Sequence, residues 1–185
     1  MPTRSSPLGA TSNAWSAPAA ASRRWSRAPS ADETRLALLA DTAAPEQVDA
    51  EAFDAIYFTG GHGVMWDFPD DAGLQHLTRE IYQRGGIVSS VCHGYCGLLN
   101  TRLDDGRLLV AGRRLTGYSW IEEVLAGVAR KVPYNVEEEM KRRGALYERS
   151  LLPFTSKVVV DGRLVTGQNP QSAKATAEQV AALLG

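Results

Sequence analysis

An apolar run that ends abruptly at a cysteine constrains the fold of this chain more than any other stretch. Residues 87–91 have the β-branched, apolar character of a buried strand, and Cys92, His93 and Gly94 follow without a break. A strand that ends in a sharp turn and continues into a helix is typical of a nucleophile elbow. The sequence therefore predicts a buried strand over 87–91, a functional turn at Cys92 and a helix-like segment over 95–101.

The position of this cysteine has consequences for its chemistry. A helix N-terminus beside the sulfur favours the thiolate, and neighbouring backbone N–H groups can bind a developing oxyanion. Free cysteines are also among the most buried residues, so a purely structural Cys92 is the alternative; the turn residues after it favour the functional interpretation. Cys96 is the only other cysteine, which is too few for a disulfide framework and indicates a reducing cytosol. A Cys92–Cys96 disulfide is not expected, because Cys92 lies in the turn itself.

A strand–helix–strand unit leads up to this turn. Residues 55–58 predict a short strand, and the loop 59–63 that follows contains three glycines, which allow a close backbone approach. Residues 69–86 begin with a proline and two aspartates, carry an apolar stripe and end in two glycines, which predicts a helix. This order of elements indicates a parallel sheet of the α/β class. Ligands bind beyond the carboxyl ends of such strands, where the glycine loop and Cys92 both fall.

The remaining chain predicts a second set of strands and helices. The clearest is a hairpin over 157–166 whose turn is an Asp-Gly pair. Ser119 and the capping-box spacing at 135–138 each predict the start of a helix. The other expected elements are a helix over 32–40 capped by Asp32, an edge hairpin over 108–118, helices that end near Leu125 and Gly144, and a last helix from Asn169 that docks on the sheet through Val180, Leu183 and Leu184.

Residues 1–31 differ in composition from the rest of the chain. They are rich in Ala, Ser and Pro, contain four arginines and lack acidic residues. This composition resembles an organellar transit peptide; the alternative, which we favour, is a disordered or wrongly assigned start. We therefore expect an atypical segment over 1–31 and one α/β domain over 32–185.

Charge and hydropathy exclude several classes of partner. The formal net charge is -1 and the isoelectric point is near 6.3, which gives no electrostatic basis for binding nucleic acid or an anionic membrane. No apolar run approaches the length of a transmembrane helix. We therefore expect a cytoplasmic protein whose partner is a small molecule.

The chain contains the groups that a cysteine nucleophile requires, which are a base, a group that orients the base, and donors for an oxyanion. The sequence offers His93 beside the cysteine, His62 in the glycine loop, and the acids Glu122 and Glu123 after a later strand. The residues expected to bind the substrate or its oxyanion are Gly60, Gly61 and His62, with N–H donors from Gly61 and His93.

Metal binding is another interpretation of some of these residues. Cys92, His93, Cys96 and His62 are all potential ligands, but their spacing matches no known zinc pattern. We therefore predict no metal site. The third histidine, His76, lies on the polar flank of its predicted helix, and we expect it to be solvated.

Four ordered motifs resemble the ThiJ/PfpI superfamily, which is related to the class I glutamine amidotransferases. The branch with the strongest resemblance is that of the chaperone-like, glutathione-independent glyoxalases (glyoxalase III), and the likeness extends from about residue 32 to the C-terminus. It implies a flavodoxin-like three-layer α/β sandwich with a mostly parallel sheet, assembled as a homodimer. The motifs are Tyr57–Asp67, Val91–Gly94, Leu115–Tyr118 and Thr166–Pro170.

The resemblance also implies a reaction and the residues that carry it. Enzymes of this branch are lyases that detoxify methylglyoxal in the stress response by converting it to lactate without a cofactor. The cysteine adds to the aldehyde carbon as a hemithioacetal, a proton moves between the two substrate carbons, and the resulting thioester is hydrolysed. By motif, Cys92 is the expected nucleophile, His93 its proton-transfer partner and Glu123 the acid that orients His93.

Two features depart from the family pattern. Members begin with a strand, a loop that carries a catalytic glutamate, a helix and a second strand, and residues 1–31 resemble none of these. Tyr95 and Cys96 stand where the family often has proline and alanine, which could narrow the pocket. Two further hypotheses stay open: a non-catalytic redox-responsive or chaperone-like stress protein, and a class I amidotransferase-like domain. The last is least favoured, because amidotransferases place their histidine far downstream of the cysteine and none follows His93.

Overall fold

The computed structural model describes residues 42–185 of the chain. The chain divides into two compact units, Met1–Val48 and Asp49–Gly185. In the first unit, the described residues contain one 3₁₀ turn, η2 (Pro45–Gln47), in which the Ala44 N–H donates to Gln47 Oε1 at 2.9 Å. The predicted helix over 32–40, the predicted boundary at residue 31 and the predicted loss of an N-terminal strand–helix–strand all concern residues outside the described range.

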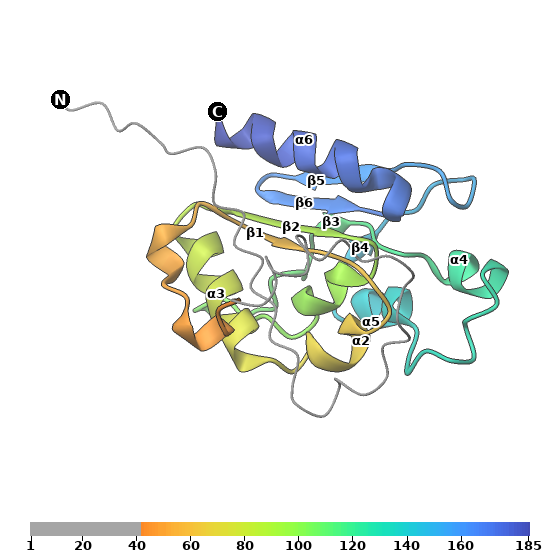
Figure 1. Cartoon of the computed structure of the whole chain (residues 1–185), viewed down its shortest axis with the longest axis horizontal. Helices are drawn as coiled ribbons and strands as arrows, with labels where there is room; N and C mark the ends of the chain where they lie inside the picture. Colours follow the sequence, from red (N-terminus) through yellow and green to blue (C-terminus); the bar gives the residue numbers. More distant parts are fainter. Residues whose placement is uncertain (1–41) are drawn as a thin grey trace. The chain divides into compact units, whose positions relative to one another are not determined.

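The second unit is organised around a four-stranded sheet with the order β1–β2–β6–β5 (Figure 1). β1 (Ala55–Phe58), β2 (Ile87–Val91) and β6 (Leu164–Gly167) are parallel, and β5 (Val158–Asp161) is antiparallel to β6. Every residue of β2 is buried, because β2 has a strand on each side and a helix on each face. The strands predicted over 55–58 and 87–91 and the hairpin predicted over 157–166 are confirmed.

Helices cover both faces of this sheet (Figure 1). α3 (Ala72–Gln83) packs against β1 and β2, and α6 (Ala173–Leu184) packs against β2 and β6 from the opposite side. This is the predicted three-layer α/β sandwich with a mostly parallel sheet. The predicted docking of Leu183 and Leu184 is wrong: both are exposed, because α6 contacts the sheet through its central turns, where Val180 is buried.

The helix starts predicted near Asp71, Ser119 and Asn135 are confirmed, whereas Asn169 precedes the 3₁₀ helix η5 and α6 begins only at Ala173. Asp71 accepts a hydrogen bond from a backbone N–H in the first turn of α3 at 2.8 Å. Asn135 does the same at 3.1 Å for α5 (Val136–Arg142), and Ser119 directly precedes α4 (Trp120–Leu125). Within residues 42–185, each helix is too short or too polar to cross a bilayer. The other elements are η3 (Ala50–Ala52), α2 (Val64–Asp67), η4 (Cys92–Leu98), β3 (Arg114–Leu115), β4 (Leu146–Tyr147) and η5 (Pro170–Ser172).

The hairpin predicted over 108–118 is wrong. β3 pairs in parallel with β4 in a separate two-stranded sheet, and Leu108 contributes only an isolated bridge to Arg102. Leu109 and Val110 are buried in the core, so hydrophobic packing rather than strand pairing accounts for this apolar run. Periodicity does not distinguish the two cases, because a short apolar run fits either.

The segment after the cysteine turn also differs from the prediction. In place of a helix over 95–101, the chain forms a 3₁₀ helix, η4, that begins at Cys92 itself. Two glycines let η4 pack closely against the end of β1. A Cβ on Gly94 would lie 2.2 Å from the Phe58 carbonyl oxygen, and one on Gly97 would lie 2.5 Å from the Phe58 ring. This close packing fixes the turn relative to the sheet.

Candidate active site

Cys92 lies in the sharp turn between β2 and η4. Its φ angle is 56°, in the left-handed region that L residues rarely adopt. Such a conformation costs about 1–2 kcal/mol and persists only where the surrounding packing enforces it. Gly60 is part of that packing, since a Cβ there would lie 2.7 Å from the Cβ of Cys92. The turn predicted from the sequence is therefore present, and the glycine loop lies against it.

Three groups surround the sulfur of Cys92. His93 Nδ1 lies 3.3 Å from Sγ. The backbone N–H groups of His93 and Gly61 hydrogen-bond to the sulfur and lower the pKa of the thiol. These are the two donors that the sequence predicted for an oxyanion, and the structure brings both to one atom.

The Cys92 thiol is nevertheless un-ionised at neutral pH. Burial raises its pKa to about 12, and the charges of Glu123 and Glu122 add to this effect against the two N–H groups. The N–H groups at the start of η4 and in the glycine loop act on the pKa in the expected direction, but burial has the larger effect. η4 is a short 3₁₀ helix, and its N–H groups do not compensate for the loss of water around the sulfur.

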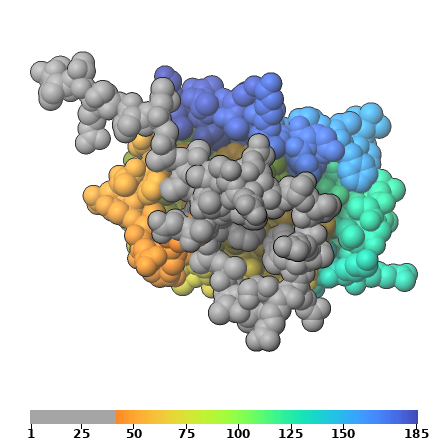
Figure 2. Space-filling model, in the orientation of Figure 1, coloured from red at the N-terminus to blue at the C-terminus, as the bar shows by residue number. Residues whose placement is uncertain are grey.

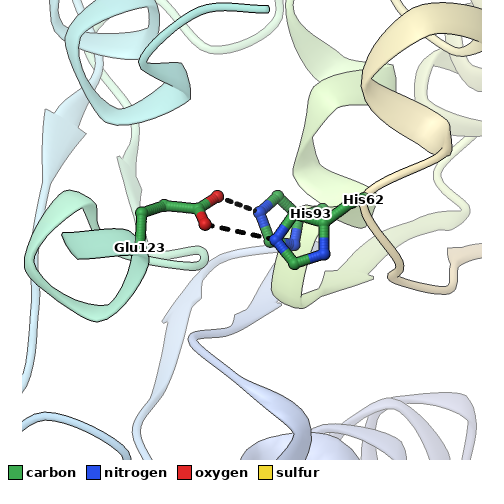
Figure 3. A group of neighbouring side chains, drawn as sticks. All are labelled: His62, His93 and Glu123. Atoms are coloured by element: carbon green, nitrogen blue, oxygen red, sulfur yellow. Dashed lines mark hydrogen bonds and ion pairs between the residues drawn. The ribbon is translucent and has the colours of Figure 1, made fainter. Parts of the chain in front are cut away.

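Glu123 joins the two histidines that the sequence singled out (Figure 3). Its Oε1 lies 2.5 Å from His93 Nε2, and its Oε2 lies 3.1 Å from His62 Nε2. The centroids of the two imidazole rings are 4.2 Å apart. His93 and Glu123 are buried, whereas the side chain of His62 is 44% exposed. α4 therefore contributes one carboxylate that holds a histidine of η4 and a histidine of the glycine loop.

The hydrogen-bond pattern of this cluster indicates where the protons are. Burial alone would raise the pKa of Glu123, but the hydrogen bonds with His93 and then His62 outweigh it, so the pKa is lowered. An ionised carboxylate only accepts hydrogen bonds, so Nε2 of both histidines carries hydrogen. In a neutral His93, the free lone pair is then on Nδ1, which faces Cys92 Sγ. This arrangement can accept the thiol proton during an attack by the sulfur.

A second buried glutamate, Glu122, fixes the position of α4. Its carboxylate accepts hydrogen bonds from the N–H and hydroxyl of Ser119 at 3.0 and 2.7 Å. It also accepts from the Phe154 N–H and the Asn169 side-chain amide, both at 2.8 Å. Burial alone would raise the pKa of Glu122, and these hydrogen bonds lower it. These hydrogen bonds of Glu122 fix α4 in the orientation in which the next residue, Glu123, contacts the two histidines.

The sequence offered Glu122 as a candidate acid and Asn169 as a helix start, but it did not predict the contact between them or the contact between His62 and Glu123. The sequence contained two signals for these residues. The Ser119–Glu122 spacing is that of a capping box, and Asn169 belongs to the motif at 166–170. The contact between these two segments joins residues 47 positions apart. No local pattern predicts a contact over that distance.

One tyrosine packs against the buried histidine, and a second tyrosine is hydrogen-bonded to the backbone of the first. The Tyr118 and His93 ring centroids are 4.7 Å apart, and burial raises the pKa of Tyr118 to about 12. Tyr95 is buried and donates its hydroxyl hydrogen to the Tyr118 carbonyl oxygen at 2.8 Å. A Cβ on Gly117 would lie 2.4 Å from the Tyr95 ring. The departure from the family pattern at Tyr95 is therefore accommodated in the core, because a glycine leaves space for the ring.

Cys96 and His76 lie outside this cluster. Cys96 is a free, buried thiol, and burial raises its pKa to about 12. His76 is exposed on α3, where its Nδ1 lies 2.9 Å from an Arg79 guanidinium nitrogen. A separate polar cavity of about 490 Å³ contains none of the predicted site residues. It is lined by Gln75, Arg79, Asn100, Arg102, Leu108 and Arg143.

Three potential metal ligands converge within residues 42–185. They are His62, His93 and Glu123, whose ligand atoms all lie within 4.8 Å of one another. The set considered from the sequence contained both cysteines and no carboxylate, so this grouping was not predicted. Glu123 is 30 residues from His93 in the chain, and only the fold brings the two together.

Comparison with known proteins identifies relatives over most of this chain. A sequence model of the DJ-1/PfpI family matches residues 28–183. The glutathione-independent glyoxalase HSP31 of Saccharomyces cerevisiae is 37% identical over 146 residues, which cover 75% of this chain and 61% of that protein. Glyoxalase 3 of Candida albicans is 36% identical over 142 residues, which cover 73% of this chain and 59% of that protein. This chain therefore spans about three fifths of the length of these relatives.

Solved structures support the same fold. The crystal structure of glyoxalase III from Candida albicans has a TM-score of 0.72 at 34% identity and covers 75% of this chain and 60% of that chain. The Rapid Encystment Protein of 24 kDa from Francisella tularensis has a TM-score of 0.76 at 32% identity, and the match covers 80% of this chain and 66% of that chain. The described sandwich is thus an arrangement that these proteins share.

Proposed function

Because this chain belongs to the DJ-1/PfpI family, we propose that it is a glyoxalase III-like enzyme that converts methylglyoxal to lactate without glutathione. The names of its relatives support this activity. The observation in this chain that carries the proposal is a line of contacts, from Cys92 Sγ to His93 Nδ1 at 3.3 Å and from His93 Nε2 to Glu123 at 2.5 Å. A thiol, a base and an orienting carboxylate in this order meet the requirements of a cysteine nucleophile.

In the first step, the sulfur of Cys92 adds to the aldehyde carbon while the thiol proton passes to Nδ1 of His93. The proton transfer accompanies the addition, because a thiol whose pKa is raised to about 12 is not ionised beforehand. Negative charge develops on the aldehyde oxygen, to which the backbone N–H groups of Gly61 and His93 can donate. His93 then returns the proton to this oxygen, and the product is a hemithioacetal.

The second step moves a proton between the two substrate carbons. His93 removes the proton from the carbon bonded to sulfur and delivers it to the neighbouring carbon, while the hydroxyl proton of the hemithioacetal passes to the ketone oxygen; the product is a lactoyl thioester on Cys92. The side chain of His62 is partly exposed at the edge of the cluster, and we assign it the role of hydrogen-bonding to the substrate oxygens. Water then cleaves the carbon–sulfur bond, releases lactate and restores the thiol. One substrate carbon is oxidised and the other is reduced, so water is the only co-reactant.

Lactate formation from methylglyoxal in the absence of glutathione tests this function. We expect the wild-type protein to form lactate and Cys92→Ser to fall to the uncatalysed rate. Cys96→Ala is the matched control and should retain activity, because Cys96 is buried outside the cluster. Equal rates for the wild type and Cys92→Ser would refute the proposal.

The alternative of a non-catalytic redox-responsive or chaperone-like protein is not favoured, since the relatives carry glyoxalase names. We place the proposed reaction in a reducing cytosol. The two free cysteines support this placement, because an oxidising compartment would favour their modification.

We further propose that the protein is a homodimer, and an exposed apolar surface supports this. The surface is formed by α4 and the segment 151–154, which lie side by side (Figure 2). Exposed apolar groups of this kind are common in protein–protein interfaces. Gel filtration with light scattering should give twice the chain mass of 20.0 kDa, and a monomer would contradict the proposal. The surface residues are Ile121, Val124, Leu125, Leu151, Leu152 and Phe154.

A further inference from the structure

The cluster that orients His93 also has the composition of a metal site. One ligand atom each of His62, His93 and Glu123 lies within 4.8 Å of the other two, and both imidazoles face the Glu123 carboxylate through Nε2 (Figure 3). Zn²⁺ binds such atoms at about 2.0–2.2 Å, which places two ligands of a tetrahedral ion about 3.3 Å apart. His62 Nε2 lies 3.1 Å from Glu123 Oε2, which is near this value, and His93 Nε2 lies 2.5 Å from Glu123 Oε1, which is shorter. Side-chain rotations that separate His93 from the carboxylate by about 0.8 Å would therefore admit the ion.

We propose that His62, His93 and Glu123 bind Zn²⁺ and that the bound ion blocks the thiol chemistry of Cys92. The blocking effect rests on the proposed function, whereas the binding does not. Two imidazoles and a carboxylate are ligands that zinc accepts, and three protein ligands with an open fourth position are typical of accessible zinc sites. The partly exposed side chain of His62 provides the route by which an ion reaches the buried ligands.

The contacts of the two neighbouring glutamates explain why the ion would select Glu123. Glu122 already accepts four hydrogen bonds, from Ser119, Phe154 and Asn169. Within the described residues, the hydrogen bonds to Glu123 come from the two histidines alone. Both histidines can exchange a hydrogen bond for a metal bond by moving a proton from Nε2 to Nδ1. Zinc would thus replace these two hydrogen bonds at Glu123 without leaving another buried group unpaired.

The same proton shift explains the effect on Cys92. When zinc occupies Nε2 of His93, the ring proton resides on Nδ1, which lies 3.3 Å from the Cys92 sulfur. Nδ1 is then a donor and cannot accept the thiol proton. The ring keeps one proton throughout, so the ion changes the tautomer and not the charge of the imidazole. Addition of the thiol to an aldehyde loses its base while the metal is bound.

Zinc binding can be measured directly by competition with a chromogenic zinc chelator on untagged, metal-free protein. We expect one Zn²⁺ per chain for the wild type and an affinity lower by at least about tenfold for His62→Ala and for Glu123→Gln. His76→Ala is the matched control, because His76 is the histidine outside the cluster, and it should bind as the wild type does. Cys92→Ser should also retain binding, since the sulfur faces the other ring nitrogen. Circular dichroism of each variant shows whether it is folded.

Several outcomes would overturn the inference. Absence of zinc binding by the wild type would do so, whether or not the protein makes lactate. Loss of binding in Cys92→Ser with retention in His62→Ala would assign the ion to the thiol instead. If the wild type forms lactate, stoichiometric zinc should abolish the rate and excess EDTA should restore it. An undiminished rate in the zinc-loaded protein would contradict the proposed block.

Discussion

Cys92 combines a left-handed backbone with a buried sulfur, and the two properties act in opposite directions on its reactivity. The turn brings the sulfur to the N–H groups of Gly61 and His93, which lower the pKa of the thiol, while burial raises that pKa by more. The reactivity of this thiol therefore depends on a base that accepts its proton during the attack. His93 Nδ1, at 3.3 Å, is that base in the proposed reaction.

The Cys92 thiol should titrate well above its ordinary pKa. In the Cys96→Ala variant, which contains one thiol, the ultraviolet absorbance of the thiolate should rise with a midpoint above the ordinary value of 9.0. Because burial is the largest cause, unfolding in urea should return the midpoint to the ordinary value. A folded-state midpoint below 9.0 would instead indicate that the folded protein stabilises the thiolate, as the sequence alone suggested.

Removal of the Glu123 charge should impair catalysis more than binding. Glu123→Gln keeps the size of the side chain but no longer orients His93 as a carboxylate does, so we expect kcat to fall by about 100-fold or more with a smaller change in KM. Steady-state lactate formation measures both constants. Glu178→Gln on the surface of α6 is the control, and comparable activity of the two variants would rule out the orienting role.

The site is built from three short segments, and the sheet explains the position of only two of them. The glycine loop follows β1 and η4 follows β2; these strands are adjacent and parallel, so their carboxyl ends meet. Proximity of Gly60, Gly61 and Cys92 was therefore predictable from the order of strand and helix signals. α4 follows no strand of the main sheet, and its position depends on the contact between Glu122 and Asn169. The assignment of Glu123 as the acid that orients His93 accordingly came from the family resemblance and not from local patterns.

Glu122 should be important for stability as well as for the geometry of the site. Glu122→Ala leaves the donors of Ser119, Phe154 and Asn169 without their acceptor, and we expect the free energy of unfolding to fall by about 3 kcal/mol. Urea denaturation followed by circular dichroism measures this loss. Glu138→Ala on the exposed side of α5 should cost much less. Similar losses for the two variants would contradict the central position assigned to Glu122.

For the whole molecule, the architecture was easier to predict than the pairing of its minor elements. Apolar periodicity, helix caps and the Asp-Gly turn are local signals, and they predicted β1, α3, β2 and the hairpin of β5 and β6. β3 and β4 join residues 114–115 with residues 146–147, a pairing that two-residue strands do not encode locally. The hairpin predicted over 108–118 failed for a different reason, because its apolar residues pack in the core and do not pair as strands.

The stability of the folded protein should decline on both sides of neutral pH. Glu122 and Glu123 have lowered pKa values in the folded state, so their stabilisation is present above the ordinary 4.5 and is lost as the pH falls below it. The pKa values of Cys92 and Cys96 are raised from 9.0 to about 12, so above pH 9.0 the unfolded chain loses these protons first and stability falls as the pH rises. Urea midpoints measured across this pH range should follow this course. The alkaline decline should be smaller in Cys96→Ala, and an equal decline would argue against burial of that thiol.

A carbon–sulfur bond at Cys92 is the intermediate on which the proposed reaction depends. The most direct measurement is mass spectrometry of protein mixed with methylglyoxal and quenched in acid during turnover. We predict an adduct on the peptide that contains Cys92, removable by hydroxylamine as a thioester is, and its absence when Cys92 is replaced by serine. Continued lactate formation with no hydroxylamine-sensitive adduct at Cys92 would contradict the proposed mechanism.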